Sequence, residues 1–242
     1  MANAQGRRIN GNLIYIDESK HLKRVIDAFG PDVIKFDERF LNSGLAAADA
    51  PVGWTITLVE AGAGESTITK PDGVDGGLLF TTDANEDDGI NAQLKGESFK
   101  LNSSCQMAYF YAKLRADEAT QIDWLVGLCI TDTTLLGGMT DGIYFEKLDG
   151  GTGVSAVTEK DSTETQTDSL HTFAANADVE LEFYFDQDTD KVEFFINGAS
   201  VATHSANICD DEDLTPSIQV LAGSAAARTL TLKHLRVIQI GY

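Results

Sequence analysis

The sequence predicts an all-β protein: an antiparallel β-sandwich of the jelly-roll kind, preceded by an N-terminal arm and one short helix. Short segments of alternating apolar and polar residues follow one another from residue 33 to the C-terminus. Gly is frequent, with 22 residues, and Pro is scarce, with 4, as expected for many strands joined by tight turns. Asn197-Gly198 lies between two alternating segments and is the strongest hairpin signal, because a type I′ turn needs positive φ at both positions.

Residues 1–34 are predicted to form a docking segment ahead of the sandwich. A polar arm leads into a short strand at residues 13–16. An amphipathic helix over residues 18–29 should follow, capped by Asp17 and ended by the Gly-Pro pair behind it. So short a helix needs a packing surface, either on this domain or on a partner.

The candidate partner-binding residues all belong to this docking segment. Four of them fall at the i, i+3, i+4, i+7 spacing of one helical stripe, and two are basic residues of the arm that could meet an acidic surface. The set comprises Leu22, Val25, Ile26, Phe29, Arg7 and Arg8.

Residues 35–242 are predicted to form the sandwich domain. The segment 106–114 should be a long strand with Ala108 and Phe110 on one face and Tyr109 on the other. A nearly continuous apolar run at residues 123–132 is typical of a strand that is covered on both faces. In the last strand the apolar parity changes, which predicts a β-bulge near Lys233-His234. Residues 159–169 are predicted to form a polar loop.

The net charge and the cysteines limit the partners and the cellular compartment that we expect for the protein. The 38 Asp and Glu against 18 Lys and Arg give a net charge of −20, and residues 1–50 contribute none of the excess. Such a surface repels a phosphate backbone, so we expect no nucleic-acid partner. Three cysteines without CxxC spacing predict reduced thiols in a cytosolic product. No run approaches the roughly 18 apolar residues of a membrane span, and no secretory signal is evident.

No motif predicts catalysis, and we expect neither an enzyme nor a cofactor. Nucleophile elbows and nucleotide-binding glycine loops are absent. Glu159, Asp161 and Glu164 fit the E-x-D-x-x-E spacing that resembles the catalytic strand of laminarinase-like glucanases. The residues between them are polar here instead of apolar, so nothing in the expected loop should hold these carboxylates rigid or raise a pKa.

Metal binding is the other chemistry that acidic spacing suggests. Asp186, Asp188 and Asp190 copy the first half of a calcium loop, but such a loop also needs Gly at its sixth position and Glu at its twelfth. Lys191 and Asn197 occupy those positions. We therefore expect a polar turn and no metal at this stretch, while a calcium site assembled from several loops stays open.

Glycan binding usually requires exposed aromatic side chains. Tyr109, Tyr111, Tyr144 and Phe195 are candidates by residue type. Aromatic residues on strands more often pack between sheets, so burial is the expected outcome for most of them.

Several segments together resemble a known pattern. They include "KFDERF", "GGLLFTTDANEDDGINAQLKGESFKL", "WLVGLCITD", "DGIYFEKLDG" and "VEFFINGASVAT". These are similar to concanavalin A-like jelly-roll domains, and within that group to virion proteins of tailed bacteriophages, especially head decoration (cement) proteins. The resembling motifs are turn glycines and core parity, so they carry no catalytic residues.

The resemblance implies a structural role on the virion. The protein would bind and stabilise the mature head shell, with the major capsid protein as partner and with copies forming a homo-oligomer on the shell. It would be made in the host cytoplasm and lie on the head exterior. The alternative is a glycan-binding jelly-roll module of a phage fibre or another adhesin. Neither role involves nucleic acid or a membrane.

Overall fold

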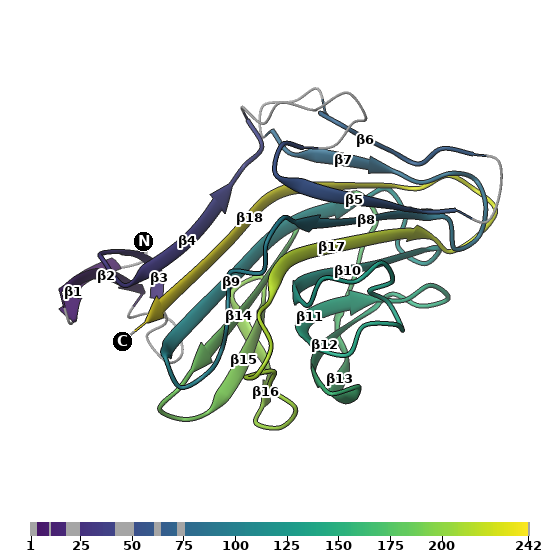
Figure 1. The fold of residues 1–242 in the computed structure, drawn as a ribbon. Helices are drawn as coiled ribbons and strands as arrows, with labels where there is room; N and C mark the ends of the chain where they lie inside the picture. The colour runs from purple at the N-terminus through teal and green to yellow at the C-terminus, as the bar shows by residue number, and fades with distance from the viewer. Residues whose placement is uncertain are drawn as a thin grey trace.

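The structure, a computed structural model, describes residues 4–9, 11–17, 25–41, 51–60, 64–71 and 76–241. These residues form two large antiparallel sheets packed face to face and a third, small sheet at the N-terminus (Figure 1). The predicted antiparallel sandwich is confirmed. Among the described residues there is no helix that could cross a membrane.

One large sheet has seven strands. Its central strand β10 is buried along its whole length, as the apolar run predicts. In spatial order the strands are β13 (Thr163–Thr172), β12 (Gly153–Lys160), β11 (Gly142–Lys147), β10 (Ile122–Cys129), β17 (Thr215–Ala222), β8 (Gly89–Leu94) and β5 (Trp54–Val59).

The other large sheet has eight strands. In order they are β16 (Ala199–His204), β15 (Lys191–Ile196), β14 (Val179–Asp186), β9 (Cys105–Ala116), β18 (Thr229–Gly241), β7 (Leu78–Thr81) and β6 (Thr67–Thr69), with β4 (Val33–Glu38) paired to β18. The register between β18 and β9 shifts between Leu232 and His234, where the change of parity predicts a bulge. That prediction is confirmed.

The core lies between the two large sheets and is rich in aromatic rings. Phe110 and Phe183, on neighbouring strands of the eight-stranded sheet, stack with ring centroids 4.7 Å apart. Phe194 of the same sheet meets Phe145 of the seven-stranded sheet edge to face at 5.3 Å. All four rings are fully buried, so they join the two layers through direct contact.

The predicted N-terminal helix is wrong where the structure can test it. Residues 18–24 lie outside the described residues, but β3 (Val25–Phe29) is a strand that pairs with β2 (Asn12–Asp17), and β2 pairs with β1 (Ala4–Ile9). A β-branched and aromatic segment suits a strand as well as a helix, and pairing with β2 supplies its backbone with partners.

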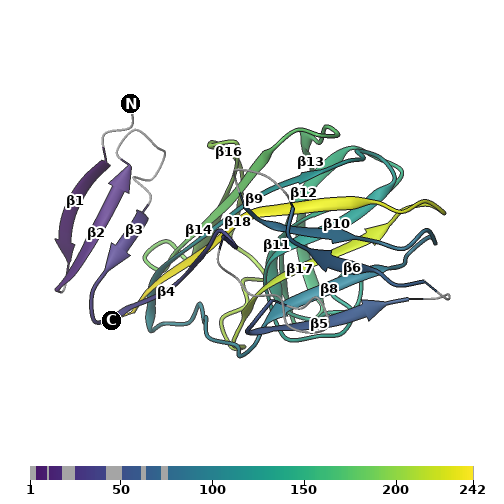
Figure 2. The same cartoon turned by 90° about the horizontal axis from the view of Figure 1, so that it is seen from above.

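This three-stranded sheet docks on its own chain. Ile14, Ile16 and Ala28 are buried against the outer face of the eight-stranded sheet, where they join a second apolar cluster. The other buried members of that cluster are Tyr109, Tyr184, Phe195, Ile238 and Ile240. Figure 2 shows the three strands beside β4 and β18. Strand β4, which follows them, spans the predicted domain boundary at residues 34 and 35.

The predicted partner-binding residues are scattered over this small sheet. Arg7 and Arg8 are exposed on β1, and Phe29 is 52 % exposed at the end of β3. Leu22 lies outside the described residues, as do the side chains of the β3 residues Val25 and Ile26. Since a strand alternates between two faces, the single helical stripe no longer supports the set. Partner binding by these six residues stays a prediction.

Two turns behave as the sequence predicts and one segment does not. Asn197 and Gly198 have φ of 51° and 76° and join β15 to β16, which confirms the hairpin. Residues 187–190 form the expected turn between β14 and β15. The predicted polar loop at 159–169 is wrong: it is a hairpin of β12 and β13. Its polar residues mark an edge strand, where both faces of a strand can meet water.

Candidate binding cleft

A loop covers part of the outer face of the seven-stranded sheet, the face that points away from the core. This cover loop consists of residues 130–141 and buries Leu135 and Met139. The two side chains pack with Leu125 and Cys129 of β10 and with Tyr144 of β11. The cover explains why β10 is buried on both faces.

Amide side chains of the sheet hold the cover loop in place. Asn91 Nδ2 donates to the carbonyl of Asp132 (2.7 Å), and Gln93 exchanges hydrogen bonds with the backbone of Ile130 and Asp132. Gln219 Oε1 accepts from the backbone N–H of Leu136 (2.7 Å). These strand positions are polar because their side chains form hydrogen bonds with backbone groups of the cover loop that are removed from water.

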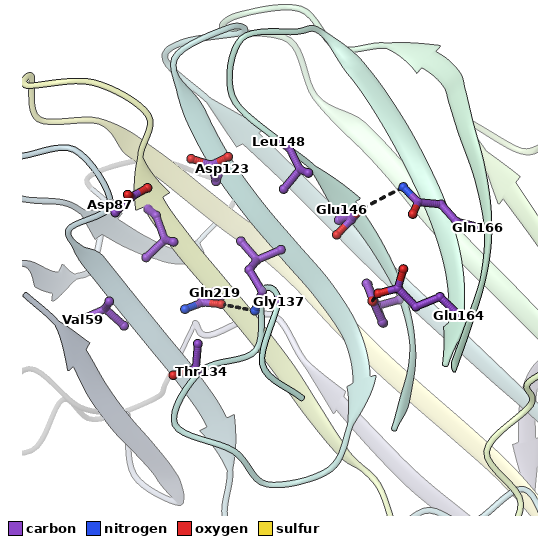
Figure 3. Close-up of a pocket in the computed structure, with 13 residues that line it drawn as sticks. Val59, Asp87, Asp123, Thr134, Gly137, Glu146, Leu148, Glu164, Gln166 and Gln219 are labelled. Carbon is purple, nitrogen blue, oxygen red and sulfur yellow. Dashed lines mark hydrogen bonds between the residues drawn. The ribbon is translucent and has the colours of Figure 1, made fainter. Parts of the chain in front are cut away.

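Beside the cover loop the same sheet face opens into a cleft of about 560 Å³ (Figure 3). A cleft of this size suits a small ligand. It is lined by Val59, Asp87, Asp123, Thr134, Leu136, Gly137, Tyr144, Glu146, Leu148, Glu164, Gln166, Gln219 and Leu221. Carboxylates and amides therefore lie next to an apolar group of leucines and one tyrosine.

Tyr144 owes its position to a glycine on the neighbouring strand. Gly127 of β10 lies directly opposite Tyr144 of β11. A Cβ on Gly127 would come within 2.5 Å of the Tyr144 Cβ and 2.3 Å of the Ile143 carbonyl oxygen. Only glycine permits this close approach.

Asp123 is the most unusual group of the cleft. Its Oδ1 accepts the backbone N–H of Asp149 at 2.6 Å. Its Oδ2 is buried and has no hydrogen-bond partner, and the whole residue is 6 % exposed. Burial raises the pKa of Asp123 to about 6, and the charges of Asp149 and Asp87 also raise it. The Asp149 hydrogen bond and the charge of Lys147 act in the opposite direction. A donor brought by a ligand would satisfy this oxygen.

Glu146 lies near Asp123 on the adjacent strand. It faces Leu125 across the β10–β11 pair, and Asp123 is two positions from Leu125 on the same face. The two carboxylates are thus diagonal neighbours, a relation that separates Cα atoms by about 7–8 Å. Gln166 Nε2 donates to Glu146 Oε1 at 3.1 Å. Burial, with the charges of Glu164 and Asp168, raises the pKa of Glu146 to about 7.

Glu159 and Glu164 also meet, but not on one strand as the glucanase spacing requires. They face each other across the β12–β13 hairpin, and Tyr144 Oη lies 3.2 Å from Glu159 and 3.4 Å from Glu164. Burial and the Glu164 charge raise the pKa of Glu159 to about 7, against the Tyr144 hydrogen bond. The expectation that nothing would raise a pKa here is therefore wrong, because the hairpin pairs two like charges.

Replacing Glu159 by glutamine should stabilise the fold at high pH only. The pKa of Glu159 is higher in the folded state, about 7, than the unfolded value of about 4.3, so the folded state binds the proton more tightly. The resulting gain in stability is fully present below about pH 4.3 and is lost as the pH rises through about 7. After allowance for solvent screening, Glu159→Gln should gain about 1 kcal/mol in free energy of unfolding at pH 8 and almost nothing at pH 4. Urea unfolding at both pH values measures the difference. An equal difference at the two values would contradict the assignment.

The four aromatic candidates are mostly buried, as expected. Tyr109 (5 % exposed) and Phe195 (1 %) lie beneath the N-terminal sheet, and Tyr111 is half-buried beside His234. Tyr144 is 3 % exposed but reaches the cleft.

The calcium-like stretch forms the turn that joins β14 to β15. Asp186 caps its own turn by accepting hydrogen bonds from the Asp188 N–H and the Thr189 hydroxyl. Elsewhere in the described residues, Asp141, Cys209 and Asp211 bring potential ligand atoms within 4.8 Å of one another. Both Asp141 oxygens already accept protein hydrogen bonds. Burial raises the pKa of Cys209 to about 12, so its thiol is neutral, and we assign no metal there.

Asp123 and Glu146 were missed by sequence reasoning, although each carries a signal. Asp123 stands alone in an apolar strand, where the core-facing neighbours are Ile122 and Trp124. A charge at an alternate position of such a strand marks the face that does not join the core. Glu146 shares that face with Tyr144.

The fold and the cleft define a class of protein: a β-sandwich of the concanavalin A type with a ligand-sized cleft on the outer face of one sheet. The chain belongs to the SO2946-like family, because the model of that family's C-terminal domain matches residues 79–236. This range contains every residue that lines the cleft except Val59. No curated protein matches the sequence.

Solved structures with the same fold are distant in sequence. The protein of unknown function SO2946 from Shewanella oneidensis MR-1 has a TM-score of 0.57 at 9% identity and covers 86% of this chain and 87% of its own. The Emp46p carbohydrate recognition domain in its potassium-bound form has a TM-score of 0.52 at 12% identity, and the match covers 76% of this chain and 88% of that domain's chain. The Bacteroides ovatus GH16 protein of a mixed-linkage glucan utilisation locus, in complex with the product G4G4G3G, has a TM-score of 0.58 at 12% identity. The match covers 84% of this chain and 99% of that one. At these identities the likeness shows the fold alone.

Proposed function

We propose that the chain is a glycan-binding module and that the cleft on the outer face of the seven-stranded sheet holds the sugar. The observation that carries the proposal is the lining of the cleft. Hydroxyl groups of a sugar need acceptors, which Asp123, Glu146 and Glu164 provide, and the apolar face of a sugar ring needs a surface such as Leu136 and Leu148. Carbohydrate recognition domains and a product-bound GH16 protein among the structures of this fold support the proposal.

The experiment is a screen of the purified protein against a glycan array, followed by calorimetry with the best soluble ligand. At pH 8, above the raised pKa of Glu146, Glu146→Gln should weaken binding at least tenfold, because the amide offers its oxygen without the charge that strengthens a hydrogen bond. Glu212→Gln, an exposed carboxylate of the loop after β16, is the matched control and should bind like the wild type. An array without hits, or equal effects of the two variants, would contradict the proposal.

Glycoside hydrolysis is the second candidate, because one observation favours it. Asp123 and Glu146 are neighbouring carboxyl groups with raised pKa values, and such hydrolysis uses two carboxyl groups about 5–10 Å apart, one of them protonated. If the protein releases reducing ends from a bound glycan, and Asp123→Asn and Glu146→Gln each abolish the release, the expectation of a non-enzyme is wrong. Binding without release leaves the module as proposed.

The virion role stays a prediction. None of the comparisons names a virion protein, so they do not support a decoration protein, a capsid partner or a location on the head exterior. Homo-oligomerisation on a shell and the absence of a nucleic-acid partner likewise stay predictions. Stoichiometric binding of the purified protein to isolated shells would support the decoration role over the module.

A further inference from the structure

Every ionisable side chain that lines the cleft, apart from the Tyr144 phenol, is a carboxylic acid. Asp87, Asp123, Glu146 and Glu164 line it, and within the described part of the chain no Lys, Arg or His does so. Lys147, which follows Glu146 on β11, is fully buried on the opposite side of the strand. The Lys147 ammonium donates to the backbone carbonyls of Ile122 and Thr120 and does not line the cleft. Its charge lowers the pKa of Asp123 but does not outweigh the effect of burial, which keeps that pKa raised.

The negative charge lies deep in the site. Asp123 and Glu146 are 6 % and 9 % exposed, and the buried Oδ2 of Asp123 lacks a donor. A buried ionised oxygen without a partner costs free energy, and a charged donor compensates that cost more fully than a neutral hydroxyl does. In addition, Glu146 and Glu159 are both repelled by Glu164. A cation in the cleft would relieve this repulsion.

From the one-signed lining and the partnerless Asp123 oxygen we infer that the cleft selects glycans that carry free amino groups. The inference rests on the proposed function and names its ligand class. Hexosamine units with a protonated amine bind more tightly than the same units with the amine acetylated. Chains of uronic acids or sulfated sugars are excluded, because like charges in a partly desolvated cleft repel each other strongly.

The test compares three oligosaccharides of equal length by calorimetry: glucosamine, N-acetylglucosamine and galacturonate tetramers. At about pH 6.5, low ionic strength and with a chelator present, the glucosamine tetramer should bind at least tenfold more tightly than its acetylated form. The galacturonate tetramer should not bind. Added salt should reduce the preference, since screening acts on the charge and not on the shared sugar ring.

Variants assign the preference to the cleft. Asp123→Asn should bring the ratio of the two affinities close to one, while Asp188→Asn, in the exposed turn between β14 and β15, should leave it unchanged. Circular dichroism verifies that both variants fold. Preference retained in Asp123→Asn, or equal binding of the amine and its acetylated form by the wild type, overturns the inference and leaves the glycan module standing. Failure of every oligosaccharide and array glycan to bind rejects the proposed function as well.

Discussion

Replacing Asp123 by asparagine is expected to weaken glycan binding at least tenfold and, at the same time, to stabilise the fold. The lost affinity follows from the loss of a charged acceptor at the base of the cleft, where Oδ2 has no protein donor. The gained stability follows from removing a carboxylate that folding buries. A side chain that lowers the free energy of unfolding but strengthens ligand binding is typical of a functional site.

The pH dependence separates this effect from general damage to the fold. The pKa of Asp123 is raised to about 6 in the folded state, so its favourable contribution is present at low pH and is lost as pH rises through about 6. Asp123→Asn should therefore gain about 1–2 kcal/mol over the wild type at pH 8 and little at pH 4. Urea unfolding measures the gain and calorimetry the affinity. Lower stability at pH 8 would show that Asp123 has a structural role.

Replacing Phe183 by alanine is expected to cost about 3–5 kcal/mol in free energy of unfolding. Phe183 is fully buried and lies in a row of rings, stacked on Phe110 and 5.9 Å from Phe194 between centroids. Truncation removes the transfer free energy of the ring and leaves a cavity that three paired strands can close only in part. Thermal unfolding followed by circular dichroism measures the loss.

A ring on the surface provides the matched control. Phe29→Ala removes the same atoms from a side chain that is 52 % exposed, at the edge of the N-terminal sheet. We expect a change below about 1 kcal/mol there. Similar losses for the two variants would mean that the row of rings is not the centre of the core.

Strand identity could be predicted from the sequence because the alternation of side chains is local. In β9 the period of two places Phe110 in the core and Tyr109 on the other face, as the sequence predicts. The change of parity near Lys233 marked the bulge in β18, because one extra residue moves every later side chain to the other face. These features depend only on residues near one another in the chain.

The helix predicted over residues 18–29 shows where the local pattern of apolar residues fails to predict secondary structure. Three of its four apolar positions, Val25, Ile26 and Phe29, lie in strand β3, so apolar spacing over so short a segment does not separate a helix from a strand. In β3 the pairing with β2 and the burial of Ala28 under the outer face of the eight-stranded sheet decide the outcome. That partner surface comes from strands far along the chain.

The sequence by itself determined the class of fold, the faces of the long strands, the Asn197-Gly198 hairpin and the acidic surface. Only the tertiary structure decided the site. Asp123 and Glu146 become neighbours through the pairing of β10 and β11, and the Glu159–Glu164 repulsion exists because a hairpin brings the two residues opposite each other. The pKa of a carboxyl group depends on burial and on nearby charges, and both arise only when strands from distant parts of the chain pack together.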